Sequence, residues 1–415
     1  ATVTAHRTHS DVRPIATMNF KQQEGDASAT AMATLIEKTF NATIASHISN
    51  LWSIPTDCPQ REKRGWMGDA GISSSSLNTF YDAFAFHVNF VRLIVDNQIK
   101  GCADQPHTSI YGPCENAQPG YFNGSVPDVT PFPTGPYGGN PGTTDWQVAF
   151  VVIARNLLLH YDRLAVPVLM EVWSYLDGFM DYLNRLSDQK TGLLLAGARG
   201  DWVPPTGSVK TSAEECAAFW HTLCVGFMAE IATAIGRSSD AARYTARLKS
   251  NRLAYHTLFY HPLLKVYGIG SQCSQVFALH AEVVPADLIK EVAGTLANKI
   301  QNSALAQANG ATGPHLEVGI FGTTFVFDVL QANGYDALAL QVLNQTTSPS
   351  LGYMIANDAT TLWEGWDGDQ HHIGKTGTSR NHIMFGGGVN RFLAAAVGGF
   401  AIETRPMVCA CACEI

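Results

Sequence analysis

The spacing of apolar residues predicts that this chain is mainly helical. Over residues 28–49 the apolar side chains, Leu35, Phe40 and Ile44 among them, recur every three or four positions, as on one face of an α-helix. Residues 74–98 repeat this pattern with more aromatic members, which we assign to a hydrophobic core. Further helices, divided by short Gly, Pro and Ser breaks, are predicted over 145–160, 163–186, 211–236, 238–258, 270–281, 285–305, 316–332, 335–346 and 379–398.

Two stretches lack a helical period. Residues 1–27 suit a strand or an extended lead-in, and residues 101–142, rich in proline and glycine, form an excursion that we expect to shape the rim of a pocket. No repeat of 20–50 residues is visible, which argues against a solenoid of near-identical units. Helices joined by short turns instead indicate antiparallel hairpins, and eleven predicted helices come close to six such pairs.

Composition favours one large folded unit. Of the 415 residues 46% are hydrophobic and only 15% are charged, so a sizeable core is available and no long solvated tract is expected. The net charge of -8 argues against a nucleic-acid partner, because such partners require clustered Lys and Arg. The chain has no uninterrupted apolar run of about 18 residues and no basic-then-apolar start, so we expect no membrane span.

The cysteines and sequons bear on the compartment. Nine cysteines leave at least one unpaired, and Cys102 with Cys114 is the first choice for a disulfide in an oxidising compartment. Cys216 and Cys224, eight apart on one predicted helix, are too distant to pair. Three sequons, at Asn41, Asn123 and Asn344, are permissive for glycosylation, and we expect a secreted glycoprotein.

Two stretches could be mistaken for metal sites. The Cys409–Cys413 tail has alternate spacing without a nearby histidine, and His371 and His372 lie beside Asp367 and Asp369 without a common ligand spacing. We predict no metal at either place.

Residues 54–70 are the candidate site. Pro55 and Pro59 exclude helix from the first half, and Gly65 and Gly68 permit backbone angles that other residues avoid, so we predict a shaped loop. A solvated charged turn is the ordinary interpretation of such a segment. Loops on a rigid frame are, however, where binding and catalytic residues concentrate.

The alternation of charge in this loop suggests chemistry. The acidic members are Asp57, Glu62 and Asp69, and the basic members are Arg61, Lys63 and Arg64. Such an arrangement can set the pKa values of neighbouring carboxyl groups apart. Trp66 adds a flat apolar face of the kind that stacks on a sugar ring. Acid catalysis on a carbohydrate is the resulting hypothesis.

Glycoside hydrolysis needs two carboxyl groups, one to protonate the leaving oxygen and one to activate water or attack carbon. The best second candidate is Glu364, which lies between Trp363 and Trp366 in the sequence. Apolar walls would raise its pKa and exclude competing water. The segments around Glu62 and Glu364 must then converge in the fold.

Residues 55–70, Pro-Thr-Asp-Cys-Pro-Gln-Arg-Glu-Lys-Arg-Gly-Trp-Met-Gly-Asp-Ala, resemble the signature of the α-L-rhamnosidases of glycoside hydrolase family 78. Motifs at 200–202, 349–353, 360–364 and 381–382 follow in that family's order, and the similarity spans roughly residues 10–400. The resemblance implies an all-α (α/α)6 barrel over 28–400. Residues 1–27 would then be the remnant of a β-sandwich domain, and 401–415 an irregular Cys-rich tail.

The resemblance also implies roles for single residues. Glu62 falls at the general-acid position and Glu364 at the general-base position. Positions that contact rhamnose match Asp57, Arg61, Trp66, Asp69, Trp146, Asp201, Trp202, Trp363 and His382. The ordinary alternatives remain open: a surface ion pair for Glu62, a capping or salt-bridged carboxylate for Glu364, and structural roles for Asp201 and His382.

The sequence therefore predicts an inverting glycosidase that releases terminal α-L-rhamnose from an oligosaccharide, polysaccharide or glycoside. It predicts no cofactor, and an oligomer is compatible with it. The rival hypotheses are a six-hairpin glycosidase that acts on another sugar, and a catalytically retired sugar-binding or assembly protein. Intact Glu62 and Glu364 argue against the second rival.

Overall fold

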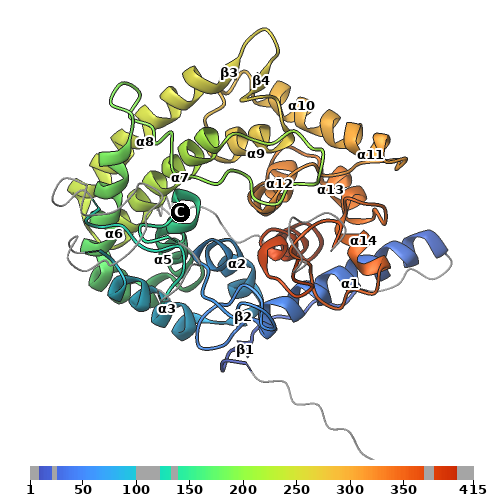
Figure 1. Ribbon diagram of the computed structural model, residues 1–415, viewed down its shortest axis with the longest axis horizontal. Coiled ribbons are helices and arrows are strands. Elements are labelled where there is room, and N and C mark those ends of the chain that lie inside the picture. Colours follow the sequence, from blue (N-terminus) through green and yellow to red (C-terminus); the bar gives the residue numbers. More distant parts are fainter. Residues whose placement is uncertain (1–8, 21–25, 100–121, 132–138, 369–377, 400–415) are drawn as a thin grey trace, which may run out of the picture.

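The computed structural model describes residues 9–20, 26–99, 122–131, 139–368 and 378–399 of the chain. Its helices form two concentric rings (Figure 1). The inner ring consists of α2 (Met67–Phe80), α5 (Ala149–Tyr161), α7 (Ala213–Ala234), α9 (Gln272–His280), α12 (Ile320–Ala332) and α15 (Val389–Phe392). These helices contact one another in that order, and α15 closes the ring on α2.

The outer helices alternate with the inner ones along the chain. They are α1 (Ala27–Ser49), α3 (Phe84–Asp96), α6 (Val166–Leu186), α8 (Ser238–Phe259), α10 (Ile289–Gln301) and α13 (Asp336–Leu343). Each precedes one inner helix, which gives six hairpins within the described residues. The predicted all-α (α/α)6 barrel is thereby confirmed.

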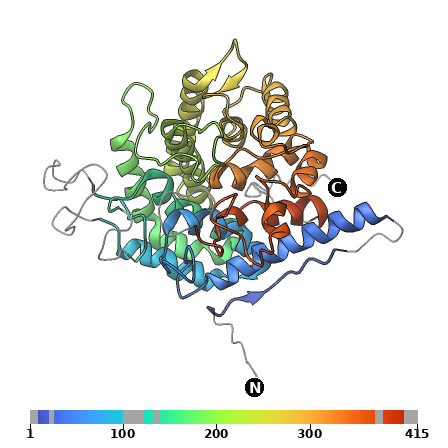
Figure 2. The same ribbon diagram turned by 45° about the vertical axis from the view of Figure 1, so that its right-hand side comes forward.

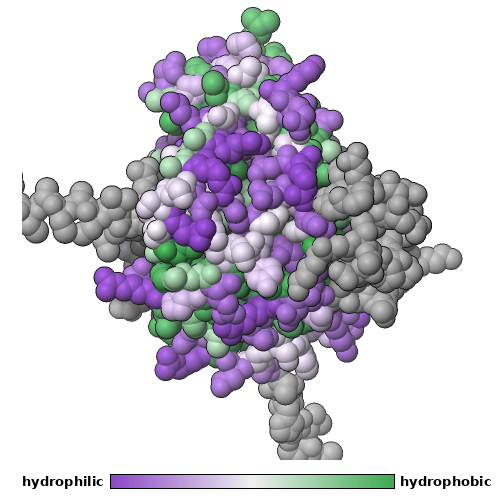
Figure 3. All heavy atoms as spheres, turned by 90° about the vertical axis from the view of Figure 1, so that its left-hand side faces the viewer, coloured by the Kyte–Doolittle hydropathy of each residue, from purple (hydrophilic) through white to green (hydrophobic). Residues whose placement is uncertain are grey.

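Burial separates the two rings. Most residues of α2 and α12 are buried, whereas α8 buries only Tyr244, Asn251 and Tyr255. The face of the molecule on the α6 side is accordingly mostly hydrophilic, with scattered apolar residues (Figure 3). The inner helices therefore make up most of the core, and their ends are free to carry a site.

Short elements complete the described structure. They are the helices α4 (Thr144–Gln147), α11 (Ala304–Ala308) and α14 (Leu351–Ala356), the hairpin of β3 (Tyr260–His261) and β4 (Val266–Tyr267), and a second antiparallel pair of β1 (Arg13–Pro14) and β2 (Tyr81–Asp82). Residues 9–20 run beside α1 (Figure 2), and Phe20 packs edge-on against Phe40 at 6.1 Å. The extended lead-in is thus seen for residues 9–20.

The helix predicted over 74–98 is wrong in its bounds. The structure divides it into α2 and α3, because Tyr81 and Asp82 leave the helix to pair with Pro14 and Arg13. The helix α2 also begins at Met67, inside the segment predicted to be a loop. Within this helix Gly71 lets α2 approach α5 closely: a Cβ there would lie 2.8 Å from that of Ala149.

The last predicted helix, 379–398, is shorter than expected. Within the described part of that stretch, a 3-10 turn covers Met384–Gly386, α15 begins at Val389, and a π-helical turn follows over Leu393–Val397. Residues 378–383 are not helical. Their side chains and amides instead complete the candidate site described below.

The remaining sequence predictions concern thiols and membranes. Cys58, Cys216, Cys224 and Cys273 are buried free thiols, so Cys216 and Cys224 do not pair, as their spacing predicted. Cys102, Cys114, the 409–413 tail and the His371–His372 pair lie outside the described residues. Among the described helices, α7 is long and apolar enough to cross a bilayer, but 72% of its apolar window is buried inside the protein, as expected for a helix of the inner ring.

Candidate active site

The loop before α2 is closed by its own hydrogen bonds. The Asp57 amide donates to the Arg64 carbonyl at 3.0 Å, and the Lys63 amide donates to the Cys58 carbonyl at 3.0 Å. Lys63 has a φ of 57°, in the left-handed region that non-glycine residues seldom occupy. This turn fixes Arg61 and Glu62 at its tip.

The two glycines of the loop act through close approach, which corrects the prediction that they supply unusual backbone angles. Neither has a positive φ. A Cβ on Gly65 would lie 2.0 Å from the Thr130 carbonyl oxygen, and one on Gly68 would lie 2.8 Å from the Trp146 ring. Gly68 therefore allows the indole of Trp146 to sit directly on the first turn of α2.

A pocket of about 100 Å³ lies at the N-terminal ends of the inner helices. It brings together two catalytic candidates and six predicted binding residues with two residues that were not predicted. Its lining is Asp57, Glu62, Trp66, Asp69, Trp146, Arg199, Trp202, Glu364, His382 and Met384. The loop before α2 and the segment around Glu364 thus converge, as predicted.

Arg61 lies between the two catalytic candidates. Its Nη2 donates to Glu364 Oε2 at 2.8 Å and to Glu62 Oε1 at 3.2 Å. The distance between Glu62 Oε1 and Glu364 Oε2 therefore cannot exceed the sum of these two distances, about 6 Å. The carboxylates of residues 302 positions apart therefore share one cation at the mouth of the ring.

Each candidate carboxylate has a second donor. Trp66 Nε1 donates to Glu62 Oε2 at 2.8 Å, and the Ser379 amide donates to Glu364 Oε2 at 2.8 Å. Among the described residues no hydrogen bond engages Glu364 Oε1, so that oxygen is available to a water molecule. Trp366 does not form an apolar wall beside Glu364, as its place in the sequence had suggested. It is buried in the core, and its Nε1 donates to the Val318 carbonyl at 2.8 Å.

Burial favours the uncharged forms of three further pocket residues. It raises the pKa of Asp57 to about 6, against the opposing effect of the hydrogen bonds from Cys58 and Arg64. It raises the pKa of Asp69 well above its ordinary value, with a further contribution from the negative charge of Asp57. It lowers the pKa of His382 to about 4.

Asp69 and His382 face one another without an ion pair. His382 Nδ1 lies 3.5 Å from Asp69 Oδ1, and both atoms are buried without a hydrogen-bond partner. Trp146 Nε1 is a third buried polar atom without a partner in the same pocket. Unpaired buried polar atoms are costly, so these three are candidates to hydrogen-bond water or a polar ligand in the pocket.

Three tryptophans form the apolar walls. The rings of Trp146 and Trp202 meet edge to face at 5.8 Å, and Trp66 is held by its bond to Glu62. The residue that joins them, Arg199, was missed by sequence reasoning. Its guanidinium carbon lies 4.8 Å from the centroid of the Trp146 ring. The available signal was its position directly before the Gly200-Asp201-Trp202 motif.

Asp201 does not line the pocket, which corrects its predicted role as a sugar ligand. It is buried, and its carboxylate accepts hydrogen bonds from the amides of Gly319, Phe321 and Gly322 at 2.5, 3.1 and 3.1 Å. It thereby anchors the start of α12, and the following residue, Trp202, reaches the pocket. The structural alternative holds for Asp201.

Trp363 does not line the pocket either. It is 4% exposed and packs edge to face against Tyr353 at 6.3 Å. The guanidinium of Arg380 lies 5.2 Å from its ring. Trp363 therefore supports the segment that carries Glu364 and is not a wall of the pocket.

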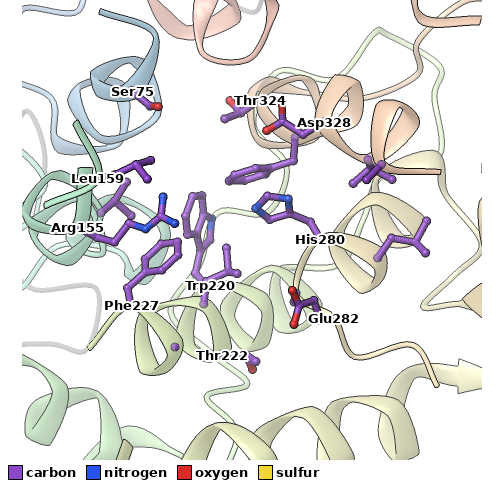
Figure 4. Close-up of a pocket in the computed structure, with 18 of the residues that line it drawn as sticks. Ser75, Arg155, Leu159, Trp220, Thr222, Phe227, His280, Glu282, Thr324 and Asp328 are labelled. Atoms are coloured by element: carbon purple, nitrogen blue, oxygen red, sulfur yellow. The ribbon is translucent and has the colours of Figure 1, made fainter. Parts of the chain in front are cut away.

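A larger cavity of about 780 Å³ occupies the other end of the ring. It lies between the C-terminal halves of the inner helices, where Figure 4 shows Arg155, Trp220, His280 and Asp328 around an open space. None of the predicted site residues lines it. This cavity is thus separate from the paired carboxylates.

No metal site is indicated by the described residues. Within them, no group of three or more His, Cys, Asp or Glu side chains could hold a metal ion.

A ring of six helical hairpins with paired carboxylates and tryptophans at one end is the arrangement expected of a six-hairpin glycosidase domain. The family model described as the bacterial alpha-L-rhamnosidase six-hairpin glycosidase domain matches residues 27–397, and the chain belongs to that family.

Similar proteins support this assignment. The chain is 30% identical over 358 residues to an alpha-L-rhamnosidase of Streptomyces avermitilis, a match that covers 85% of this chain and 30% of the relative. It is 31% identical to the solved alpha-L-rhamnosidase of Dictyoglumus thermophilum, with a TM-score of 0.73 over 87% of this chain and 37% of that one.

Two further structures extend the comparison. The Streptomyces avermitilis enzyme complexed with L-rhamnose shares 26% identity at a TM-score of 0.72 and covers 88% of this chain and 32% of that one. The Aspergillus terreus enzyme, at 21% identity and a TM-score of 0.72 over 93% of this chain and 41% of that one, shows the same fold. The chain spans about a third of the length of the curated relatives that it matches.

Proposed function

We propose that this chain is the catalytic domain of an α-L-rhamnosidase, which releases terminal α-L-rhamnose from a rhamnose-containing glycoside or saccharide. The observation that carries the proposal is the convergence of Glu62 and Glu364 on one cation, Arg61, beside a tryptophan-walled pocket. The names of the relatives support the choice of sugar. Intact carboxylates at both positions argue against a retired enzyme.

The proposed mechanism divides the work between the two carboxyl groups. Glu62 acts as the general acid and protonates the glycosidic oxygen as the bond to the anomeric carbon breaks. Glu364 acts as the general base and takes a proton from the water that attacks that carbon. Glu364 Oε1, which engages no described donor, is the oxygen that we assign to this water.

The remaining pocket residues bind the sugar in this proposal. Asp57, Asp69 and His382 present polar atoms to its hydroxyl groups, and burial opposes the charged forms of Asp69 and His382 most strongly. Arg61 lies where it can contact a hydroxyl and both carboxylates. The tryptophan walls exclude water and pack on the apolar faces of the ring.

Inversion is part of the proposal. Inverting enzymes separate their carboxyl groups by about 6.5–9.5 Å, and retaining enzymes by about 5–5.5 Å. The upper limit of about 6 Å concerns only the distance between Glu62 Oε1 and Glu364 Oε2, the two oxygens that accept from Arg61. We propose that substrate and water enter between the carboxylates and widen this separation as Arg61 turns to the sugar.

A panel of aryl glycosides tests the choice of sugar. The purified chain is incubated with 4-nitrophenyl α-L-rhamnoside and with the matching glycosides of other common sugars, and release of nitrophenol is followed. The proposal predicts hydrolysis of the α-L-rhamnoside at a rate at least 100-fold above the others. Preference for another glycoside would support the rival six-hairpin hypothesis, and hydrolysis of none would contradict an active domain.

We also propose that the protein is exported and glycosylated. The asparagines of its three sequons, Asn41, Asn123 and Asn344, are all exposed on the surface. Treatment of the natively expressed protein with an endoglycosidase should lower its apparent mass, and an unchanged mass would contradict this proposal.

A further inference from the structure

Arg199 occupies a central position among the tryptophans of the pocket. Its guanidinium carbon lies 4.8 Å from the ring centroid of Trp146 and 5.7 Å from those of Trp66 and Trp202. A cation within about 6 Å of an indole is attracted by the negative face of the ring. One side chain therefore holds three rings that come from three separate segments.

The orientation of Arg199 is fixed from its other side. Its Nη2 donates to Asp128 Oδ2 at 2.7 Å, and its Nε donates to Thr143 Oγ1 at 3.2 Å. The carboxylate of Asp128 is only 1% exposed and also accepts from the amides of Gly139 and Thr143 at 2.9 and 2.7 Å. Two fixed acceptors set the plane of the guanidinium, which a lysine could not match with its single charged nitrogen.

The network reaches the proposed general acid through Trp66. The Trp66 ring contacts Arg199 with its π-system and donates from Nε1 to Glu62 Oε2 at 2.8 Å. The backbone of Asp128 also accepts from the Met67 amide at 2.8 Å, which ties the same network to the first residue of α2. A change at Arg199 would consequently move a wall of the pocket and a hydrogen bond of Glu62.

We propose that Arg199 is a positioning residue that fixes the three tryptophan walls of the sugar pocket and, through Trp66, the carboxylate of Glu62. This inference rests on the proposed function for its substrate. The partner of Arg199, Asp128, belongs to the excursion of residues 101–142 that we expect to shape the rim of a pocket, and it supports the site through Arg199.

The test compares Arg199→Lys with a matched control. Arg155→Lys changes another arginine that pairs with a carboxylate, Glu230 at 3.0 Å, and lies over an aromatic ring, Phe227 at 4.9 Å, in the cavity at the opposite end. For Arg199→Lys we expect the KM for an aryl α-L-rhamnoside and the inhibition constant of L-rhamnose to rise about tenfold, with a several-fold fall in kcat. Arg155→Lys should leave all three unchanged.

A second variant guards against misfolding. Arg199→Met with Asp128→Asn removes both charges and so avoids a buried unpaired carboxylate. It should keep a cooperative unfolding transition and lose activity at least as strongly as Arg199→Lys. Wild-type KM and inhibition constant in Arg199→Lys, or equal losses in Arg155→Lys, would overturn the proposal.

A measurement without sugar separates this proposal from the choice of substrate. Tryptophan emission and its quenching by acrylamide should change in Arg199→Lys, because the walls loosen, and should stay at wild-type values in Arg155→Lys. That result would uphold the positioning role even if the enzyme acted on another sugar. Identical emission and quenching in Arg199→Lys and the wild type would contradict it.

Discussion

The hydrogen bond from Trp66 to Glu62 can be removed with little change in the pocket wall. Trp66→Phe keeps an aromatic face over the loop and deletes the Nε1 donor that lies 2.8 Å from Glu62 Oε2. As the proposed general acid, Glu62 becomes a carboxylate while it gives up its proton in the transition state, and a hydrogen bond to a charged partner contributes about 1.5–3 kcal/mol. At about 1.4 kcal/mol for each factor of ten, the loss corresponds to a fall in kcat/KM of roughly 10- to 100-fold.

The assay is initial-rate hydrolysis of an aryl α-L-rhamnoside, with the inhibition constant of L-rhamnose measured on the same samples. Because the bond positions a group that acts in the transition state, we expect kcat to carry most of the loss and the inhibition constant to rise only a few-fold. Trp202→Phe is the matched control: Trp202 lines the same pocket but is 37% exposed. Equal effects in Trp66→Phe and Trp202→Phe would refute the reasoning.

Two other predictions address the carboxyl groups. Glu62→Gln and Glu364→Gln should each lower kcat by orders of magnitude while the affinity for L-rhamnose changes only a few-fold, and an unchanged kcat would remove that residue from its role. Glu215 is fully buried and accepts hydrogen bonds from Tyr255 and Ser274. Burial raises its pKa from 4.5 to about 7. Between pH 4.5 and 7 the folded protein therefore keeps a proton on Glu215 that the unfolded chain has lost. Stability should therefore fall by about 3 kcal/mol from pH 4.5 to 7 through this group, and urea titrations should show a smaller fall in Glu215→Gln; the same fall in both proteins would contradict the assignment.

Much of the fold was readable from helical periodicity, because the hairpins of a helical ring depend on apolar spacing and short turns. Helix bounds were less accessible. The break at Tyr81 depends on pairing with residues almost seventy positions earlier, and the first turns of α2 pack closely on Trp146 and Ala149 through Gly68 and Gly71. Neither contact leaves a local signal in the sequence.

The side chains that line the pocket could be predicted where they belong to a sequence motif, but not where tertiary packing determines their orientation. Glu62, Glu364 and Trp66 meet as predicted, since the family signature covers their segments. Asp201 and Trp363 belong to motifs of the same family, but the backbone turns their side chains into the interior. Arg199 was missed because two of the three rings that it contacts, Trp66 and Trp146, are distant from it in sequence and adjacent only in the fold.

The measurement that tests the central claim most directly is the stereochemistry of the first product. The purified chain is mixed with an α-L-rhamnoside, and the anomeric proton of the released sugar is followed by NMR during the first minutes, before mutarotation. A general acid at Glu62 and a general base at Glu364 acting on water predict β-L-rhamnose as the first-formed sugar. An initial α product would mean that a carboxylate attacks carbon directly, and would contradict the assignment of Glu364 as a base.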